Sequence, residues 1–303
     1  MSRKLWCVSV VLLSFGCASK PTTGSREPSS APMLCQNLHR MEIHSHRGAW
    51  DRPENMMSAF NRAISQGSDF VEMDLQISKD NQIIVAHDAF MKDECLDSKG
   101  QPLPKRVYYR DMTVAHIKTY DCGSRVRIGR SVPGEKISTL AEVLAELKDR
   151  TTNKGTPLGL NIEIKYNPTQ PQFYPSREFY VDRIMEVIDR SGIEMSRTMI
   201  QSFDVGVLKV VRQKRASMRL SPLLGEALDG VQIAKDIKAD LVTPHFGLVS
   251  PEMLSKYHEN GIRVVPWTVN HPEQALQMIE WGADGIITDY PEWIDFTKRF
   301  CGN

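Results

Sequence analysis

Short apolar stretches alternate with helical patterns along most of the chain. The stretches that predict strands lie near residues 42–46, 69–77, 82–87, 158–165, 198–202, 219–224, 240–243, 262–269 and 285–288. The helical patterns lie at 55–66, 138–149, 177–191, 204–215, 231–237, 251–260, 272–281 and about 291–300. This alternation indicates a parallel sheet covered by helices. With 82–87 as a side hairpin, it predicts an α/β fold of the (β/α)8 TIM barrel type. A doubly wound open sheet is the alternative, but no Gly-x-Gly-x-x-Gly follows an early strand.

A single segment breaks this alternation. Residues 88–136 lie between a strand and the next helix and have no clear periodicity. A connection of this length is usually a functional lid or a small subdomain, so we expect an insertion after the second strand region. The side chains that could face a substrate from it are Tyr108, Tyr109, Arg125, Arg127 and Arg130, and a solvated loop surface is the alternative, which is favoured for each residue taken singly.

The first residues form a region of their own. A short positive head precedes an apolar run from Leu5 to Phe15, which is too short to span a membrane and is typical of an export signal. The small residue before Cys17 resembles the bacterial lipoprotein processing site. We therefore expect a signal peptide over 1–16, a lipid anchor on Cys17 and a periplasmic or outer-membrane location, with plain secretion as the alternative. A Ser-, Pro- and Thr-rich stretch predicts a disordered tether over 17–38, followed by the barrel domain over 39–303.

Composition narrows the class of partner. The 303 residues are 41% hydrophobic and 25% charged, with a net charge of +1. A chain with these values can bury a large core. So balanced a charge gives no reason to expect a nucleic acid partner.

Four cysteines remain once the signal segment and the lipidated cysteine are set apart. In an oxidising compartment an even number indicates disulfides, and four cysteines allow three pairings. Because the two ends of a domain usually lie close together, we favour Cys35 with Cys301. Cys95 and Cys122 flank one part of the insertion and form the second favoured pair. Buried free thiols are the alternative.

Acidic side chains alternate with apolar ones in two predicted strands. Glu72 and Asp74 are two residues apart and therefore share one face. Neighbouring carboxylates repel each other, and a bound cation relieves both the repulsion and the cost of burial. In a later strand, Glu163 could supply a third ligand and Lys165 could neutralise a phosphate oxygen. Oxygen ligands of this kind suit Mg²⁺ or Ca²⁺, whereas solvent-exposed carboxylates are the alternative interpretation.

Two histidines lie at predicted strand ends, where barrel enzymes place their catalytic groups. His46 ends the first strand and His87 ends the hairpin. Histidine exchanges protons near neutral pH, and Arg47 can hold a phosphate through paired hydrogen bonds. His44 shares the face of His46 one layer deeper, and we expect it to be packed there. His245 follows a later strand and is a further candidate for the barrel mouth.

These residues belong to a series of motifs. The motifs are His46-Arg47-Gly48, Pro53-Glu54-Asn55, Ala59-Phe60, Glu72-x-Asp74, His87-Asp88, Glu163-x-Lys165, Trp267-Thr268-Val269-Asn270 and Gly282-Ala283-Asp284-Gly285-Ile286-Ile287-Thr288-Asp289-Tyr290-Pro291. The series runs from about 42 to 298 and resembles the glycerophosphodiester phosphodiesterases, which are α/β barrels. One departure is Met56, where the family usually has Thr, and it concerns a helix start.

The resemblance implies the metal-dependent hydrolysis of small-molecule glycerophosphodiesters to glycerol 3-phosphate and an alcohol. It implies that Glu72, Asp74 and Glu163 bind a divalent metal, Ca²⁺ or Mg²⁺. It also implies that His46 and His87 are the general acid and base. The nucleophile is either water or the neighbouring glycerol hydroxyl, which would first give a cyclic phosphate.

The resemblance further implies how the substrate is bound. Arg47 and Lys165 would bind phosphate, and Trp267 would pack against the glycerol carbons. Glu54 would orient Arg47 or a metal-bound water.

Other functions remain open at this point. A lysophospholipase D or a sphingomyelinase-D-like phosphodiesterase on a related barrel would act on intact lipid, close to where a lipid-anchored enzyme lies. A non-catalytic envelope binding protein would keep the barrel and bind metal without turnover. A sugar-processing barrel is disfavoured, because its two carboxylates would flank a sugar instead of sharing one strand.

Overall fold

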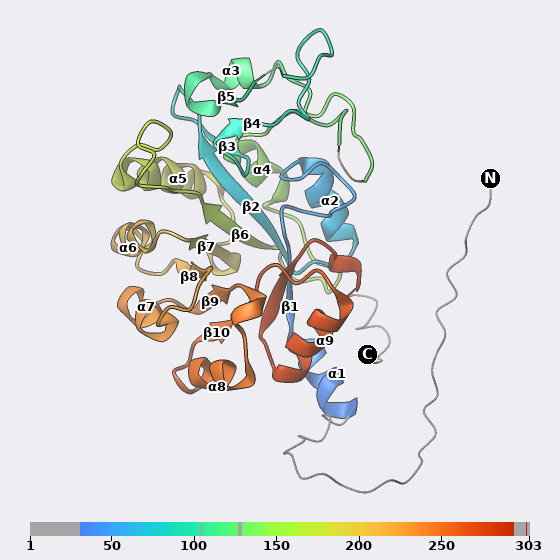
Figure 1. Cartoon of the computed structure of the whole chain (residues 1–303), viewed down its shortest axis with the longest axis vertical. Coiled ribbons are helices and arrows are strands. Elements are labelled where there is room, and N and C mark those ends of the chain that lie inside the picture. The colour runs from blue at the N-terminus through green and yellow to red at the C-terminus, as the bar shows by residue number, and fades with distance from the viewer. Residues whose placement is uncertain (1–30, 104, 127–128, 294–300, 302–303) are drawn as a thin grey trace, which may run out of the picture.

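Eight parallel strands and the helices between them form a barrel (Figure 1). The computed structural model describes residues 31–103, 105–126, 129–293 and 301. The barrel strands are β1 (Glu42–Ser45), β2 (Phe70–Ile77), β6 (Gly159–Ile164), β7 (Thr198–Ser202), β8 (Arg219–Leu224), β9 (Leu241–Pro244), β10 (Arg263–Val264) and β11 (Gly285–Thr288). The helices around them are α2 (Met57–Ser65), α4 (Leu140–Leu147), α5 (Arg177–Ser191), α6 (Val205–Lys214), α7 (Gly230–Ile237), α8 (Pro251–Glu259) and α9 (Pro272–Trp281). The predicted TIM barrel is confirmed.

The sheet closes almost completely on itself. Neighbouring strands follow the order β10, β9, β8, β7, β6, β2, β1, β11, so β10 and β11 form its two edges. Backbone hydrogen bonds bridge these edges, from Asp284 N to Val264 O at 3.0 Å and from Ile287 N to Pro266 O at 2.8 Å. The carboxyl ends of the parallel strands therefore meet at one end of the barrel, which we call the mouth.

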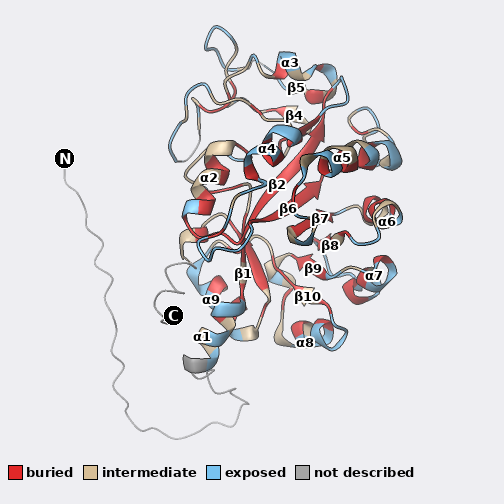
Figure 2. Cartoon of the chain, turned by 180° about the vertical axis from the view of Figure 1, so that it is seen from behind, coloured by how far each residue is buried: buried red, intermediate tan, exposed pale blue. Residues whose placement is uncertain are grey.

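Residues of β2 alternate between two environments. Val71, Met73 and Leu75 pack in the apolar layer between the strands and the helices. Because successive strand residues point to opposite faces, Glu72 and Asp74 face the barrel interior. Figure 2 shows the same division across the molecule, with buried strands and with helices that are exposed on their outer sides.

Helix starts follow the capping residues in the sequence. Thr139 caps α4 by accepting a hydrogen bond from Glu142 N, and the Glu142 carboxylate returns to Thr139 N at 2.8 Å. This reciprocal pair satisfies two N–H groups that a helix start otherwise leaves without partners. At α2 the capping position is Met56, whose side chain makes no such bond. Helix α2 therefore begins without a side-chain cap, at the helix start where the sequence departs from the family pattern.

The insertion between β3 (Ile83–Val85) and α4 is a small packed subdomain. It contains the antiparallel strands β4 (Phe90–Met91) and β5 (Val107–Tyr108), the 3-10 helix η1 (Tyr109–Asp111) and the short helix α3 (Val114–Ile117). Strand β3 pairs with β2 in antiparallel fashion and forms the predicted side hairpin. The insertion also has an apolar cluster of its own, which includes Met91, Met112, Ile117 and Ile137.

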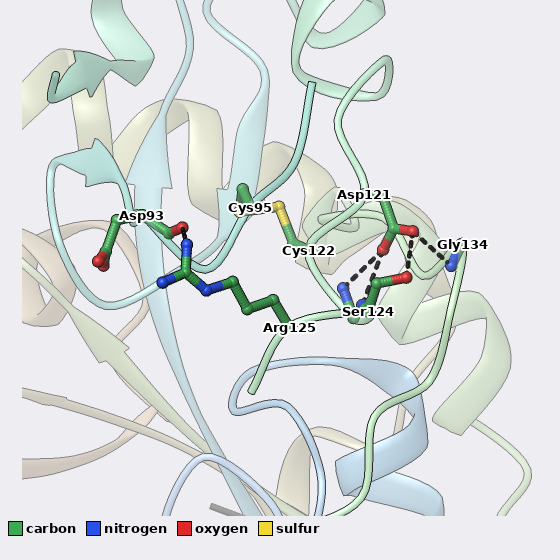
Figure 3. The surroundings of a disulfide bond; sticks show 8 residues. Asp93, Cys95, Asp121, Cys122, Ser124, Arg125 and Gly134 are labelled. Atoms are coloured by element: carbon green, nitrogen blue, oxygen red, sulfur yellow. Dashed lines mark hydrogen bonds between the residues drawn. A yellow bond between two sulfur atoms is a disulfide. The ribbon is translucent and has the colours of Figure 1, made fainter. Parts of the chain in front are cut away.

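A disulfide between Cys95 and Cys122 joins two long segments of the insertion (Figure 3). Beside it, the Asp121 carboxylate accepts hydrogen bonds from Ser124 N at 2.9 Å and Ser124 Oγ at 2.6 Å. On the other side, Arg125 donates to a main-chain carbonyl at 3.3 Å. These cross-links fix a part of the chain that has little regular secondary structure.

Helix α1 (Ala31–Arg40) packs against the barrel domain instead of belonging to a tether. Leu38 is fully buried, and a disulfide joins Cys35 to Cys301. The tether predicted over 17–38 is therefore wrong for residues 31–38, because an apolar contact and a covalent bond attach them to the barrel. Both favoured disulfide pairings are present.

Some predictions concern residues that the structure does not describe. The signal over 1–16, Cys17 and the tether up to residue 30 lie outside the described residues. The predicted last helix at 291–300 is described only over 291–293, which are helical. Within the described ranges, no helix has both the length and the apolarity that crossing a bilayer requires.

Candidate active site

Three carboxylates converge inside the barrel near its mouth. Glu72 and Asp74 come from β2 and Glu163 from β6, and Asp74 and Glu163 are paired neighbours in the sheet. They are 1%, 0% and 6% exposed, respectively. One oxygen of each lies within 4.8 Å of the others. Three acidic groups this close and this buried need positive charge beside them.

Two basic side chains supply part of that charge. Lys165 Nζ lies 3.0 Å from Asp74 Oδ1 and 2.6 Å from Glu163 Oε1. Arg47 Nε lies 3.3 Å from Asp74 Oδ2. Asn55 also donates to Asp74 Oδ2, at 2.8 Å. The predicted phosphate-binding pair and the predicted metal ligands thus form one connected cluster.

The ionisation of the cluster differs from residue to residue. Burial, together with the charges of Asp74 and Glu163, raises the pKa of Glu72 well above its ordinary value. Burial also raises the pKa of Glu163 to about 7, against the opposing effect of Lys165. Burial would raise the pKa of Asp74 as well, but Lys165 and Arg47 outweigh it and hold that pKa below its ordinary value. Without further positive charge, the three groups therefore favour fewer than three negative charges.

The cluster fits a divalent cation. The buried oxygens Asp74 Oδ1 and Glu163 Oε1 lie in ion-pair contact with Lys165, yet neither accepts a well-directed hydrogen bond from any described residue. Carboxylate oxygens converging in this way are the ligand set of Ca²⁺ and Mg²⁺. Glu72, Asp74 and Glu163 would hold such an ion.

The two candidate histidines are each bound to an aspartate. His46 Nδ1 lies 2.6 Å from Asp289 Oδ1, and His87 Nδ1 lies 3.0 Å from Asp88 Oδ1. Asn270 holds the other Asp289 oxygen at 2.5 Å. When Nδ1 donates to a carboxylate, Nε2 is left to accept or deliver a proton at the site.

An unusual turn brings Arg47 into place after β1. Arg47 and Asn55 have positive φ angles of 56° and 59°, and Gly48 has a φ of 92°. A Cβ atom at Gly48 would lie 2.6 Å from the Cβ of Ala59, so only glycine fits there. In this turn Arg47 N donates to Glu72 Oε2 at 2.8 Å. Strained backbone of this kind is typical of functional sites.

A cavity of about 370 Å³ lies between the mouth and the insertion. His46, Arg47, Glu54 and His87 form its barrel side. Glu54 Oε2 lies 3.2 Å from Arg47 Nη1, so the two side chains form an ion pair at the cavity wall. The side chains that form the insertion side include Phe90, Cys95, Tyr109, Cys122 and Arg125.

Other candidates lie elsewhere. Among the described residues, Tyr108 and Arg130 do not line the cavity, and Arg127 lies outside the described residues. Trp267 follows β10 and packs edge-on against Phe203 and His245, with ring centroids 5.3 and 5.2 Å apart. Trp267, Phe203 and His245 do not line the cavity, so they lie on another side of the mouth.

The structure also gives roles to residues for which the sequence predicted none. Asp289 and Asn270 orient His46, and Asn55 holds Asp74. Gln201 donates to Glu72 Oε1 at 3.2 Å. Gln201, Asn270 and Asp289 lie at or after the ends of predicted strands, which is the signal that could have identified them. Asn55 lies instead at the start of the helix predicted at 55–66.

The mouth of this (β/α)8 barrel combines a carboxylate cluster, an arginine, a lysine and two oriented histidines. This combination is typical of enzymes that act on phosphate esters. The model of the glycerophosphoryl diester phosphodiesterase family matches residues 46–293. The chain belongs to this family and is a phosphodiester hydrolase.

Known proteins are similar to this chain in sequence and fold over most of its length. The glycerophosphodiester phosphodiesterase of Caldanaerobacter subterraneus subsp. tengcongensis is 31% identical over 252 residues, which cover 82% of this chain and 94% of the relative. A solved structure from Silicibacter pomeroyi DSS-3 that carries the same family name has a TM-score of 0.78 at 25% identity, over 86% of this chain and 94% of its own. An Oleispira antarctica phosphodiesterase, solved with its product sn-glycerol-3-phosphate, has a TM-score of 0.70 at 20% identity, over 84% and 95%.

Proposed function

We propose that this protein hydrolyses glycerophosphodiesters to glycerol 3-phosphate and an alcohol, with the help of Ca²⁺ or Mg²⁺. The observation that carries the proposal is the convergence of three buried carboxylates, within 4.8 Å of one another, beside Lys165 and Arg47. The product bound to the Oleispira antarctica phosphodiesterase, which has the same fold, supports the substrate class.

The first requirement of this reaction is that the negative charge on the phosphoryl oxygens is stabilised. Glu72, Asp74 and Glu163 would hold the cation, which when bound would supply Lewis-acid stabilisation of the phosphoryl oxygens. Lys165 and Arg47 lie beside those carboxylates and can bind phosphate oxygens, Arg47 through a forked pair of hydrogen bonds. Charges fixed in advance in this way usually contribute more to catalysis than any other single effect.

Proton transfer is the second requirement. His46 and His87 share it: one takes the proton of the attacking water or glycerol hydroxyl at Nε2, and the other donates a proton from Nε2 to the oxygen of the P–O bond that breaks, so that this oxygen leaves as the alcohol. Asp289 and Asp88 hold their Nδ1 atoms, so the reacting nitrogens keep a fixed direction.

The two sides of the mouth suit the two parts of the substrate. Trp267, with Phe203 beside it, offers an apolar surface for the glycerol carbons. The cavity beneath the insertion borders both histidines and takes the alcohol that leaves. Its volume of about 370 Å³ admits a small head group.

One assay tests the function. We expect the purified protein to release the alcohol from glycerophosphocholine or glycerophosphoethanolamine, to lose this activity with a chelator and to regain it with Ca²⁺ or Mg²⁺. Lysophosphatidylcholine serves as the comparison substrate, and its preferred turnover would indicate a lysophospholipase D instead. Undiminished turnover after complete metal removal would contradict the proposed metal dependence, and metal binding without turnover of any diester would indicate a binding protein.

The role of the cavity is tested through its disulfide. Cys95 and Cys122 line the cavity, so replacing both with Ala should loosen its insertion side and raise KM for glycerophosphocholine by up to about tenfold, with a smaller change in kcat. The matched control replaces Cys35 and Cys301, the disulfide at α1, and should lower the melting temperature without changing KM. Equal KM values for both double variants would contradict a role of the cavity in substrate binding.

Export with a lipid anchor on Cys17 remains part of the proposal. Two disulfides support an oxidising compartment. The mass of the mature N-terminus tests the anchor.

A further inference from the structure

A line of polar side chains runs through the barrel interior below the carboxylate cluster. It consists of His44 from β1, Asn161 from β6 and Gln201 from β7, which are 0%, 0% and 2% exposed. Barrel interiors are usually filled by branched apolar side chains. Buried polar groups cost stability unless each finds a partner, so their presence here calls for a specific role.

These side chains form a continuous chain of hydrogen bonds. Asn161 Nδ2 donates to His44 Nδ1 and to Gln201 Oε1, each at 3.2 Å. Gln201 Nε2 then donates to Glu72 Oε1 at 3.2 Å. Rotating the Asn161 amide would turn its oxygen toward two acceptors, so the observed orientation is the one that satisfies both. The chain therefore presents an N–H donor to Glu72.

Glu72 depends on this donor more than its neighbours do. Among the described residues, ion pairs with Lys165 or Arg47 hold Asp74 and Glu163. Within the part of the chain that the structure describes, the hydrogen bonds that Glu72 accepts come from two neutral donors, Arg47 N on Oε2 and Gln201 Nε2 on Oε1. Each carboxylate oxygen keeps a second lone pair, which is free for a cation.

The lower end of the line is anchored as well. His44 stacks on Phe70 with ring centroids 4.2 Å apart, and its Nε2 lies 3.5 Å from Glu42. With Nε2 directed at that carboxylate, Nδ1 is the acceptor that Asn161 requires. The ring thus fixes Asn161, which in turn fixes Gln201.

We propose that Gln201 is a positioning residue for Glu72, with Asn161 and His44 fixing it from behind, and that this line presets the carboxylate for a divalent cation. The inference rests on the proposed function, because it assumes that Glu72 is a metal ligand. Partners that orient metal ligands typically contribute about 10- to 100-fold to metal affinity.

The test measures ion binding directly. We expect Gln201→Leu to weaken the binding of Ca²⁺ or Mg²⁺, measured by titration calorimetry, by about 10- to 100-fold. Excess ion should restore kcat, which a general loss of structure would not allow. His44→Phe keeps a ring that can stack on Phe70 but removes the acceptor, and should give a smaller loss of affinity.

The matched control is Ser221→Ala. It removes another buried hydrogen bond of the barrel, which joins Ser221 Oγ and Thr243 Oγ1 at 3.0 Å. We expect this variant to keep the ion affinity of the wild type. A folded Gln201→Leu protein that binds the ion like the wild type overturns the inference. If Gln201→Leu does not fold, unchanged affinity in His44→Phe overturns it. A wild-type protein that binds neither ion overturns the proposed function itself.

Discussion

Replacing His46 with alanine should lower kcat by about 10²- to 10⁴-fold, the usual contribution of a positioned general acid or base. His46 borders the cavity, and Asp289 holds its Nδ1 at 2.6 Å. The substitution removes the imidazole but leaves Lys165 and the carboxylates in place. We therefore expect the KM for glycerophosphocholine to change only a few-fold, and steady-state kinetics measure both values.

A matched control is available at the other end of β11, the strand that Asp289 follows. His258 Nε2 lies 2.9 Å from Asp284, which precedes β11, whereas Asp289 follows β11 at the mouth. His258→Ala therefore removes an equivalent pair away from the mouth and should leave kcat unchanged. If His46→Ala and His258→Ala had the same turnover, His46 would have no part in proton transfer.

The barrel was predictable because its elements carry strong local signals. The helices predicted at 177–191 and 272–281 have these bounds in the structure. Each ends at a left-handed glycine, Gly192 or Gly282, which terminates a helix without steric cost. Apolar residues on both sides of Glu72 and Asp74 likewise indicated a buried strand.

Strand β10 shows where such signals fail. The apolar stretch 262–269 predicts a long strand, but β10 covers only Arg263–Val264. Pro266 has no N–H to continue the ladder, and Trp267 pairs with His245 only through an isolated bridge. Hydrophobicity thus placed the strand correctly and overestimated its length.

The pairings between side chains that are distant in the sequence could not be predicted from it. Asp289 binds His46 across 243 positions, and Gln201 binds Glu72 across 129. Nothing in local spacing selects these partners, because the order of the strands around the barrel brings them together. The candidate metal ligands could be predicted because Glu72 and Asp74 share a strand and Glu163 belongs to a similar alternating pattern.

Among substitutions in the carboxylate cluster, we expect Asp74→Asn to have the largest effect on ion affinity and kcat. Asp74 is the residue that Lys165 and Arg47 both contact, so its charge balances two buried cations. The amide keeps the shape but loses the charge. We expect ion affinity to fall by more than the roughly 10- to 100-fold that residues behind metal ligands contribute, and kcat to fall at least about 100-fold. Calorimetry and kinetics measure the two effects.

Asp69→Asn separates this effect from a general loss of stability. Asp69 directly precedes β2 at the opposite end of the barrel, lies 2.5 Å from Lys154 and accepts a hydrogen bond from Ile43 N at 3.0 Å. Residues at that end of a barrel serve stability, whereas the mouth carries the chemistry. We therefore expect Asp69→Asn to lower the melting temperature and to bind Ca²⁺ or Mg²⁺ like the wild type. Normal ion affinity in Asp74→Asn would instead mean that the three carboxylates do not form a cation site.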